Sequence, residues 1–223
     1  MKIIRFSLLL CMMSIIISCG KEKSGKIKSS SDRKISGFEA PVPVDKGFSE
    51  FISAYTSGVI SVNSPVEIHF TPDFAVKAGR KLPSGLITFD PAIKGKTEWI
   101  DETTLVFRPD KILTPGTLYR GSLNLGKLAV VPENLKVFPL QIRTIKRDFI
   151  VRTGILECTS AESNAYILHG ELIASDYIPS NEIESCLEAR LERNRLSVSW
   201  DHSDMLVHKF TISGIIRTQK PQN

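Results

Sequence analysis

Short stretches in which apolar and polar residues alternate run through the middle of the chain. Between Val66 and Phe70, apolar residues alternate with Glu67 and His69, which is the period-two pattern of a strand with one buried face. We expect Thr71-Pro72-Asp73 to end this strand, because proline cannot donate a hydrogen bond into a sheet. Further strands, separated by turn residues such as proline, glycine and aspartate, are predicted at 86–89, 97–100, 104–107, 118–125 and 138–145. Closely spaced strands with few helical stretches are typical of an antiparallel β-sandwich.

A second unit begins near Arg147. Strands are predicted there at 149–156, 165–173, 196–200 and 208–216. Residues 181–193 fit two patterns, because Ile183 and Leu187 share a helical face and also fall in strand alternation; we favour a strand. The fold class is therefore all-β, with two consecutive antiparallel β-sandwich domains over 47–146 and 147–223. A typical seven-stranded sandwich needs about 100 residues, so we expect the second domain to be incomplete.

The N-terminal residues have the pattern of a leader. Lys2 and Arg5 precede an apolar run over 6–17. This run is shorter than the about 20 residues that are needed to span a membrane. Residues 1–18 therefore fit a signal peptide. The run Ile16-Ile17-Ser18-Cys19 resembles the bacterial lipobox, which implies cleavage before Cys19 and lipidation of its thiol. An uncleaved N-terminal anchor is the alternative.

The next segment, 19–46, is dominated by serine, lysine and glycine. Such a composition cannot bury enough apolar surface to fold, so we expect a flexible tether. Its basic residues either favour an anionic lipid surface or serve only as a soluble spacer. Gly20 stands where an aspartate often retains lipoproteins in the inner membrane of Gram-negative cells. We therefore place the protein in the cell envelope, lipid-anchored in the outer membrane and facing the periplasm.

The net charge of +5 is confined to the leader and the tether. Residues 47–223 contain twenty basic and twenty acidic residues, so the folded part has no basic excess and no recognisable nucleic-acid motif. Beyond the anchor, Cys158 and Cys186 are the remaining cysteines. An envelope location permits a disulfide between them, and two buried thiols are the alternative.

Several stretches resemble bacterial alpha-2-macroglobulin-family lipoproteins. The first unit is similar to the first Ig-like module of that family in the stretches 64–70, 95–109 and 113–119. The second unit is similar to the next macroglobulin-like domain in the stretches 166–176, 196–200 and 208–215. Together the resemblance covers roughly 45–217. It implies an Ig-like β-sandwich followed by a macroglobulin-like β-sandwich.

Members of that family trap proteases with a bait segment and a thioester, and some pair with a penicillin-binding protein. The thioester requires a Cys-x-Glu-Gln run. Cys158 is followed by Thr-Ser-Ala and Cys186 by Leu-Glu-Ala, so this chemistry is not carried over. The resemblance therefore implies a non-catalytic envelope scaffold, similar to the N-terminal part of an endopeptidase inhibitor, with proteases or a penicillin-binding protein as partners. A stand-alone Ig-like adhesion or binding module is the alternative.

Candidate catalytic residues are absent from the sequence pattern. There is no Gly-x-Ser-x-Gly, P-loop or His-Glu-x-x-His run. The histidines show no metal-ligand spacing; they are His69, His169, His202 and His208. Both tryptophans, Trp99 and Trp200, are predicted as core residues. We therefore expect no enzyme activity, no cofactor and no metal site.

Overall fold

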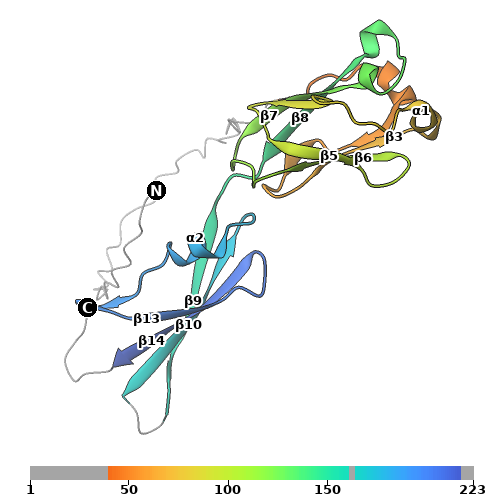
Figure 1. The fold of residues 1–223 in the computed structure, drawn as a ribbon. Helices are drawn as coiled ribbons and strands as arrows, with labels where there is room; N and C mark the ends of the chain where they lie inside the picture. The colour runs from red at the N-terminus through yellow and green to blue at the C-terminus, as the bar shows by residue number, and fades with distance from the viewer. Residues whose placement is uncertain (1–39, 161–163, 217–223) are drawn as a thin grey trace, which may run out of the picture.

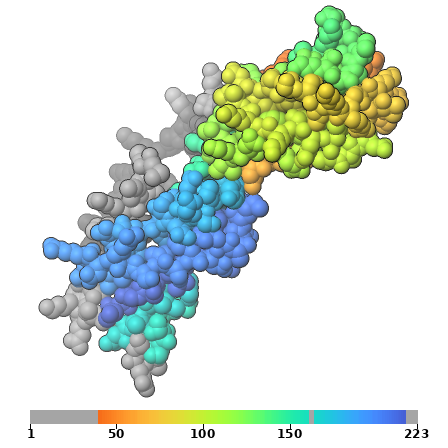
Figure 2. Space-filling view, in the orientation of Figure 1, coloured from red at the N-terminus to blue at the C-terminus, as the bar shows by residue number. Residues whose placement is uncertain are grey.

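The computed structural model describes residues 40–160 and 164–216, which fold into two β-rich domains in tandem (Figure 1). Figure 2 shows the domains as two lobes that meet end to end. The first domain contains η1 (Lys46–Glu50), β1 (Ile52–Tyr55), β2 (Gly58–Ile60), β3 (Val66–Phe70), α1 (Pro72–Lys77), β4 (Ile87–Asp90), β5 (Gly95–Trp99), β6 (Thr104–Pro109), β7 (Leu118–Asn124), η2 (Leu125–Lys127), η3 (Glu133–Leu135) and β8 (Val137–Thr144). The second contains β9 (Phe149–Cys158), β10 (Ala165–Ala174), α2 (Ser180–Glu184), β11 (Arg190–Leu191), β12 (Asn194–Arg195), β13 (Ser197–Asp201) and β14 (Val207–Ile216). The all-β prediction is confirmed.

The first domain is a sandwich of two four-stranded sheets. One sheet has the order β1-β3-β6-β5 and the other β2-β8-β7-β4. All their strand pairs are antiparallel except β2 with β8, which is parallel. A single hydrophobic cluster fills the space between the sheets. Phe107 is buried in this cluster and Trp99 packs against it, in line with the prediction of Trp99 as a core residue.

A short helix follows β3 where the sequence predicted only the end of a strand. Proline at Pro72 does stop the strand, but its fixed φ also suits the first turn of α1. The Thr71 hydroxyl caps the helix by accepting from the Phe74 N–H at 3.4 Å. Phe74 and Ala75 are buried against the core, so tertiary packing stabilises a helix too short to form alone. No helix within residues 40–160 and 164–216 has the length and apolar character needed to cross a membrane.

The second domain is built on one four-stranded sheet with the order β13-β14-β10-β9. Its inner face packs against α2 and the segment that follows it: Ile183 joins Leu172 in one small cluster, and Ala189 joins Phe210 in another. The strand predicted over 181–193 is therefore wrong for its first part, which is α2. Ile183 is fully buried, and one helical turn is enough to place it against the sheet before the chain turns into β11.

The two domains are joined by a buried carboxylate. Asp176 follows β10 in the second domain and is only 6% exposed. Its Oδ1 accepts from the Ser61 hydroxyl at 2.5 Å, and its Oδ2 accepts from the Val62 N–H at 2.8 Å. The neighbouring Tyr177 packs against the hydrophobic cluster of the first domain. A side chain of the second domain thus completes the hydrogen bonding of a turn in the first.

Candidate functional site

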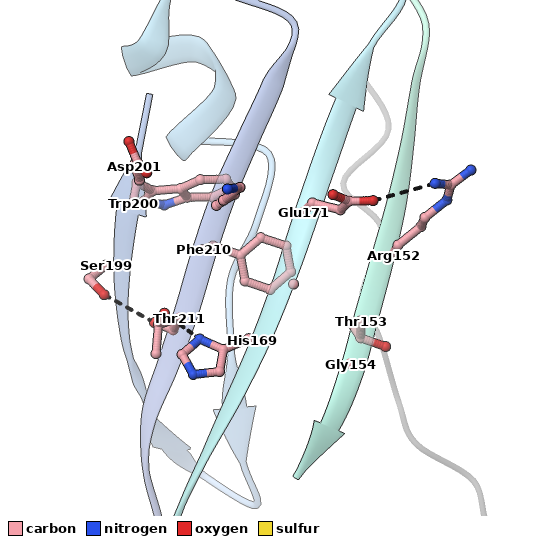
Figure 3. Close-up of a pocket in the computed structure, with 12 residues that line it drawn as sticks. Arg152, Thr153, Gly154, His169, Glu171, Ser199, Trp200, Asp201, Phe210 and Thr211 are labelled. Carbon is pink, nitrogen blue, oxygen red and sulfur yellow. Dashed lines mark hydrogen bonds and ion pairs between the residues drawn. The ribbon is translucent and has the colours of Figure 1, made fainter. Parts of the chain in front are cut away.

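A hollow of about 620 Å³ lies over the sheet of the second domain (Figure 3). Side chains alternate along a strand, so residues next to buried Leu172 and Phe210 point to the opposite face from α2. The side chains that line the hollow from this outer face are Arg152, His169, Glu171, Ser199, Asp201, Lys209 and Thr211. We call this surface the polar face.

Four charges of alternating sign cross the polar face from one sheet edge to the other. Asp201 on β13 is paired with Lys209 on β14, Lys209 with Glu171 on β10, and Glu171 with Arg152 on β9. The Arg152 Nη1 lies 3.4 Å from the Glu171 Oε1. Opposite charges in neighbouring strands contribute roughly 0.2–1 kcal/mol each. The ladder therefore supports the sheet and presents both signs of charge to solvent.

The next row of the polar face carries hydroxyl and imidazole groups. The His169 Nδ1 lies 2.9 Å from the Thr211 Oγ1, and the Ser199 hydroxyl donates to the Thr211 carbonyl at 3.4 Å (Figure 3). On its other side, the His169 Nε2 is 4.0 Å from the Glu157 Oε2. A hydroxyl, an imidazole and a carboxylate in this order occur in nucleophilic catalysis. Thr211, however, lies in the middle of β14, which pairs with strands on both sides, so the ladders use its neighbouring N–H groups. The row supplies hydrogen-bonding groups, and no oxyanion site is built around Thr211.

Asp201, at the end of the charge ladder, is held in its ionised form. The Ser203 N–H donates to the Asp201 Oδ1 at 2.9 Å. This bond is the largest cause that lowers the pKa of the Asp201 carboxyl, and the Ser203 hydroxyl and the nearby Lys209 and His202 lower it further. A carboxylate that is already hydrogen-bonded remains charged at neutral pH.

Gly170 allows the Phe210 ring to pack closely against the strands beneath the hollow. Gly170 on β10 lies opposite Phe210 on β14, and the Phe210 ring lies across it. A Cβ at this position would come within 2.3 Å of the Phe210 Cζ. Gly170 therefore makes room for the ring on the inner face, which fixes the strand pair that carries Glu171 and Lys209.

The polar face was not predicted as a site, although His169 was examined as a candidate. Strand alternation already puts His169 and Glu171 on one face of β10, and Lys209 and Thr211 on one face of β14. That signal is in the sequence. The pairing of β10 with β14, which brings the two sets together, is not.

The other histidines and Trp99 lie elsewhere, whereas Trp200 also lines the hollow. His69 is on β3 with its Nδ1 3.1 Å from the Thr104 Oγ1. His202 and His208 contact each other through their Nδ1 atoms. Trp99 and Trp200 pack against hydrophobic clusters. In the part of the chain that the structure describes, no three or more His, Cys, Asp or Glu residues are grouped to hold a metal ion.

The structure differs from both expectations for the two cysteines of the folded part. Cys158 and Cys186 are not joined by a disulfide, and both are exposed. The alternative of two buried thiols is therefore also wrong, because Cys158 ends the edge strand β9 and Cys186 follows α2 at the surface. Cys19, the signal peptide and most of the tether lie outside the described residues. Lipidation of Cys19 and the envelope location remain predictions.

Comparison with known proteins finds no matching family model and no matching curated protein. Among solved structures, L,D-transpeptidase 3 from Mycobacterium tuberculosis is similar with a TM-score of 0.30 and 15% identity, over 53% of this chain and 44% of that one. An L,D-transpeptidase from Mycobacterium tuberculosis H37Rv has a TM-score of 0.29 and 14% identity, over 69% of this chain and 59% of that one. The chain thus spans about half the length of these proteins.

These comparisons contradict the alpha-2-macroglobulin resemblance. The similar structures cited above are L,D-transpeptidases, and no family model or curated sequence supports a macroglobulin. The endopeptidase-inhibitor scaffold is overturned with it, and the stand-alone Ig-like module finds no support in these comparisons. The exclusion of enzyme activity is also overturned, because the similar structures are enzymes. The hairpin and turn motifs behind the resemblance describe strand geometry, which unrelated β-domains share. At TM-scores of 0.29–0.30, the likeness gives this chain no activity of its own.

Proposed function

We propose that the polar face of the second domain binds a short peptide that carries both an ammonium and a carboxylate group. The observation that carries this proposal is the ladder of alternating charges beside a row of hydroxyl and imidazole groups, over a hollow of about 620 Å³. That volume falls in the range of small-ligand sites, about 300–1,000 Å³.

The charges of the polar face match a zwitterionic ligand. Lys209 and Arg152 can donate to a carboxylate, and charge-assisted hydrogen bonds of this kind are roughly twice as strong as neutral ones. Asp201 and Glu171 can accept from an ammonium group. Because each acidic side chain lies beside a basic one, a ligand with a single sign of charge would meet repulsion from half of the ladder. A ligand with both signs can be placed without such repulsion.

The dimensions of the polar face favour an extended peptide. Four strands spaced by about 4.8 Å give a ladder of roughly 14 Å from Asp201 to Arg152, the length of about four extended residues. The hydroxyl and imidazole row runs beside it and can bind peptide N–H and C=O groups. The aromatic side chains of the lining, Trp200 and Phe210, pack into the hydrophobic cluster on the other face. The polar face therefore offers charges, hydroxyls and the His169 imidazole for a peptide, while the larger aromatic rings pack away from it.

Binding can be measured by NMR titration of the full chain with a zwitterionic tetrapeptide such as Ala-Lys-Glu-Ala. We expect amide shifts that cluster on β10, β13 and β14, and weaker binding at high salt. Lys209→Gln should weaken binding by about tenfold, because a charge-assisted hydrogen bond contributes about 1.5–3 kcal/mol. A matched control is Arg108→Gln, which removes another exposed cross-strand cation, this one from the first domain, where Arg108 pairs with Glu98 at 2.8 Å.

The control should bind like the wild-type protein. Absence of shifts at millimolar peptide, or equal losses in Lys209→Gln and Arg108→Gln, would show that the ladder only supports the sheet.

A further inference from the structure

Behind the polar face, on the α2 side of the sheet, two histidines form a chain with a glutamate. His208 on β14 is 3% exposed. Its Nδ1 lies 2.9 Å from the Nδ1 of His202, which belongs to the connection between β13 and β14. The His202 Nε2 lies 3.2 Å from the Glu184 Oε1 at the end of α2. The buried His208 Nε2 has no hydrogen-bond partner among the described residues. These contacts connect α2 to the sheet through two titratable imidazole rings.

The number of protons on the two rings decides whether this chain of contacts holds. A carboxylate only accepts, so the His202 Nε2 that faces Glu184 carries a proton. The contact between the two Nδ1 atoms is a hydrogen bond only when one of them is protonated and the other is not. It survives when both rings are neutral and when His202 alone is an imidazolium ion. It is lost when both rings are charged, because two N–H groups then face each other.

The surroundings make the second proton unfavourable. Burial is the largest cause that lowers the pKa of His208, a protonated His202 lowers it further, and Asp204 opposes both. The charged groups around the pair are Glu184 on α2, Asp201 and Asp204 at the start of and within the β13–β14 connection, and Lys209 on β14. Both carboxylates of the connection accept backbone N–H groups, from Ser203 and from Leu206 and Val207. Those bonds keep both carboxylates at the loop, so no carboxylate of residues 40–160 and 164–216 lies within hydrogen-bonding distance of a charged His208.

We propose that the His202–His208 pair is a proton-operated latch, which holds α2 against the second sheet near neutral pH and releases it in acid. Release would expose Ile183, which is fully buried against Leu172 and Ile178. The cluster that Ile183 completes is small. The ion pair between Arg147 and Glu182 of α2 is exposed to solvent, so it adds little to the stability of the contact.

The direction of the pH effect follows from proton binding. The folded-state pKa of His208 is lowered, so the released form binds more protons than the latched form. The latch is therefore fully effective above the ordinary histidine value of about 6.5 and weakens as the pH falls below it.

Hydrogen exchange of the full chain at about pH 7.5 and about pH 5, corrected for the intrinsic pH dependence of exchange, tests the latch. We expect protection of residues 183–189 to fall by roughly tenfold or more at the lower pH, while β3 and β6 in the first domain keep theirs. His208→Phe should abolish the difference between the two pH values. His69→Gln, which removes a half-buried histidine of the first domain, is the matched control and should retain it.

Equal protection of 183–189 at both pH values would overturn the latch, as would a His208→Phe variant with unchanged pH dependence. If that variant does not fold, NMR titration of the histidine ring protons of the wild-type chain decides instead. We expect His208 to titrate below the ordinary histidine value of about 6.5. A His208 that titrates at or above that value would contradict the proposal. None of these outcomes depends on whether the polar face binds a peptide.

Discussion

Phe107 illustrates how a single side chain joins the two sheets of the first domain. It is 4% exposed on β6, and its ring centroid lies 5.4 Å from that of Phe89 on β4, in the opposite sheet. Tilted aromatic pairs at this distance contribute beyond the area they bury. The residue therefore links two layers that have no hydrogen bonds to each other through these strands.

Replacing this ring should be costly. We expect Phe107→Ala to lower the free energy of unfolding by about 3–5 kcal/mol, because the truncation leaves a cavity between two rigid sheets. Ile100→Ala, at a side chain that is 51% exposed, is the control and should change stability by less than about 1 kcal/mol. Urea unfolding followed by tryptophan fluorescence measures both. A loss below 1 kcal/mol for Phe107→Ala would mean that the core tolerates the cavity by collapsing.

At the scale of elements, β10 organises the second domain. It pairs with β14 along eight residue positions and with β9 along eight more, in both cases across an irregularity in register. Its inner residues Leu172 and Ala174 build the hydrophobic cluster with α2, and its outer residues His169 and Glu171 line the polar face. One strand thus couples the packing of the domain to its candidate site.

Gly170→Ala should lower the stability of the second domain, although alanine is in general more favourable than glycine within a strand. The added methyl group would lie 2.3 Å from the Phe210 Cζ and 2.8 Å from the Arg152 carbonyl oxygen, so the ring or the strand must move. Overpacking of this kind costs about 1–3 kcal/mol. The comparison is Gly154→Ala on β9, where the nearest atom is 3.3 Å away. Thermal unfolding should separate the two variants, and equal midpoints would show that Phe210 moves aside freely.

At the scale of the whole molecule, Asp176 determines how the domains are joined. It accepts hydrogen bonds from Ser61 and Val62 of the first domain and from the Tyr177 N–H of its own segment. Ser175 strengthens the same junction, because its hydroxyl donates to the Lys146 carbonyl and accepts from the Asp148 N–H. Both residues follow β10, so the strand that carries the polar face also positions the first domain.

Asp176→Ala should loosen the junction. It leaves the buried Val62 N–H without its acceptor, which costs about 1–3 kcal/mol, while each domain keeps its own core. We expect a wider distribution of interdomain distances in small-angle scattering, with the sandwich of the first domain intact by circular dichroism. Asp110→Ala, at an exposed position of the first domain, should leave the scattering unchanged. A scattering profile of Asp176→Ala identical to the wild type would show that Tyr177 packing suffices.

The sequence alone determined most of the strands. Alternation over 66–70, 104–107, 165–173 and 208–216 matches β3, β6, β10 and β14 closely, because the period of side chains along a strand is a local property. The sequence also indicated Trp99 as a core residue of the first domain. Local signals were misjudged where two patterns competed. Pro72 ends a strand and also starts a helix, and Ile183 fits either period, so burial against the rest of the fold decided both cases.

Only the tertiary structure decided where function can lie. The charge ladder joins residues as far apart as Arg152 and Lys209, and the junction joins Ser61 to Asp176, 115 positions along the chain. The latch joins Glu184 to His208 through His202. Register and layer packing create each of these contacts, and they depend on which strands pair. Alternation shows which face of a strand a residue occupies, but the residues that share this face on the neighbouring strands are fixed by the free energy of the whole fold.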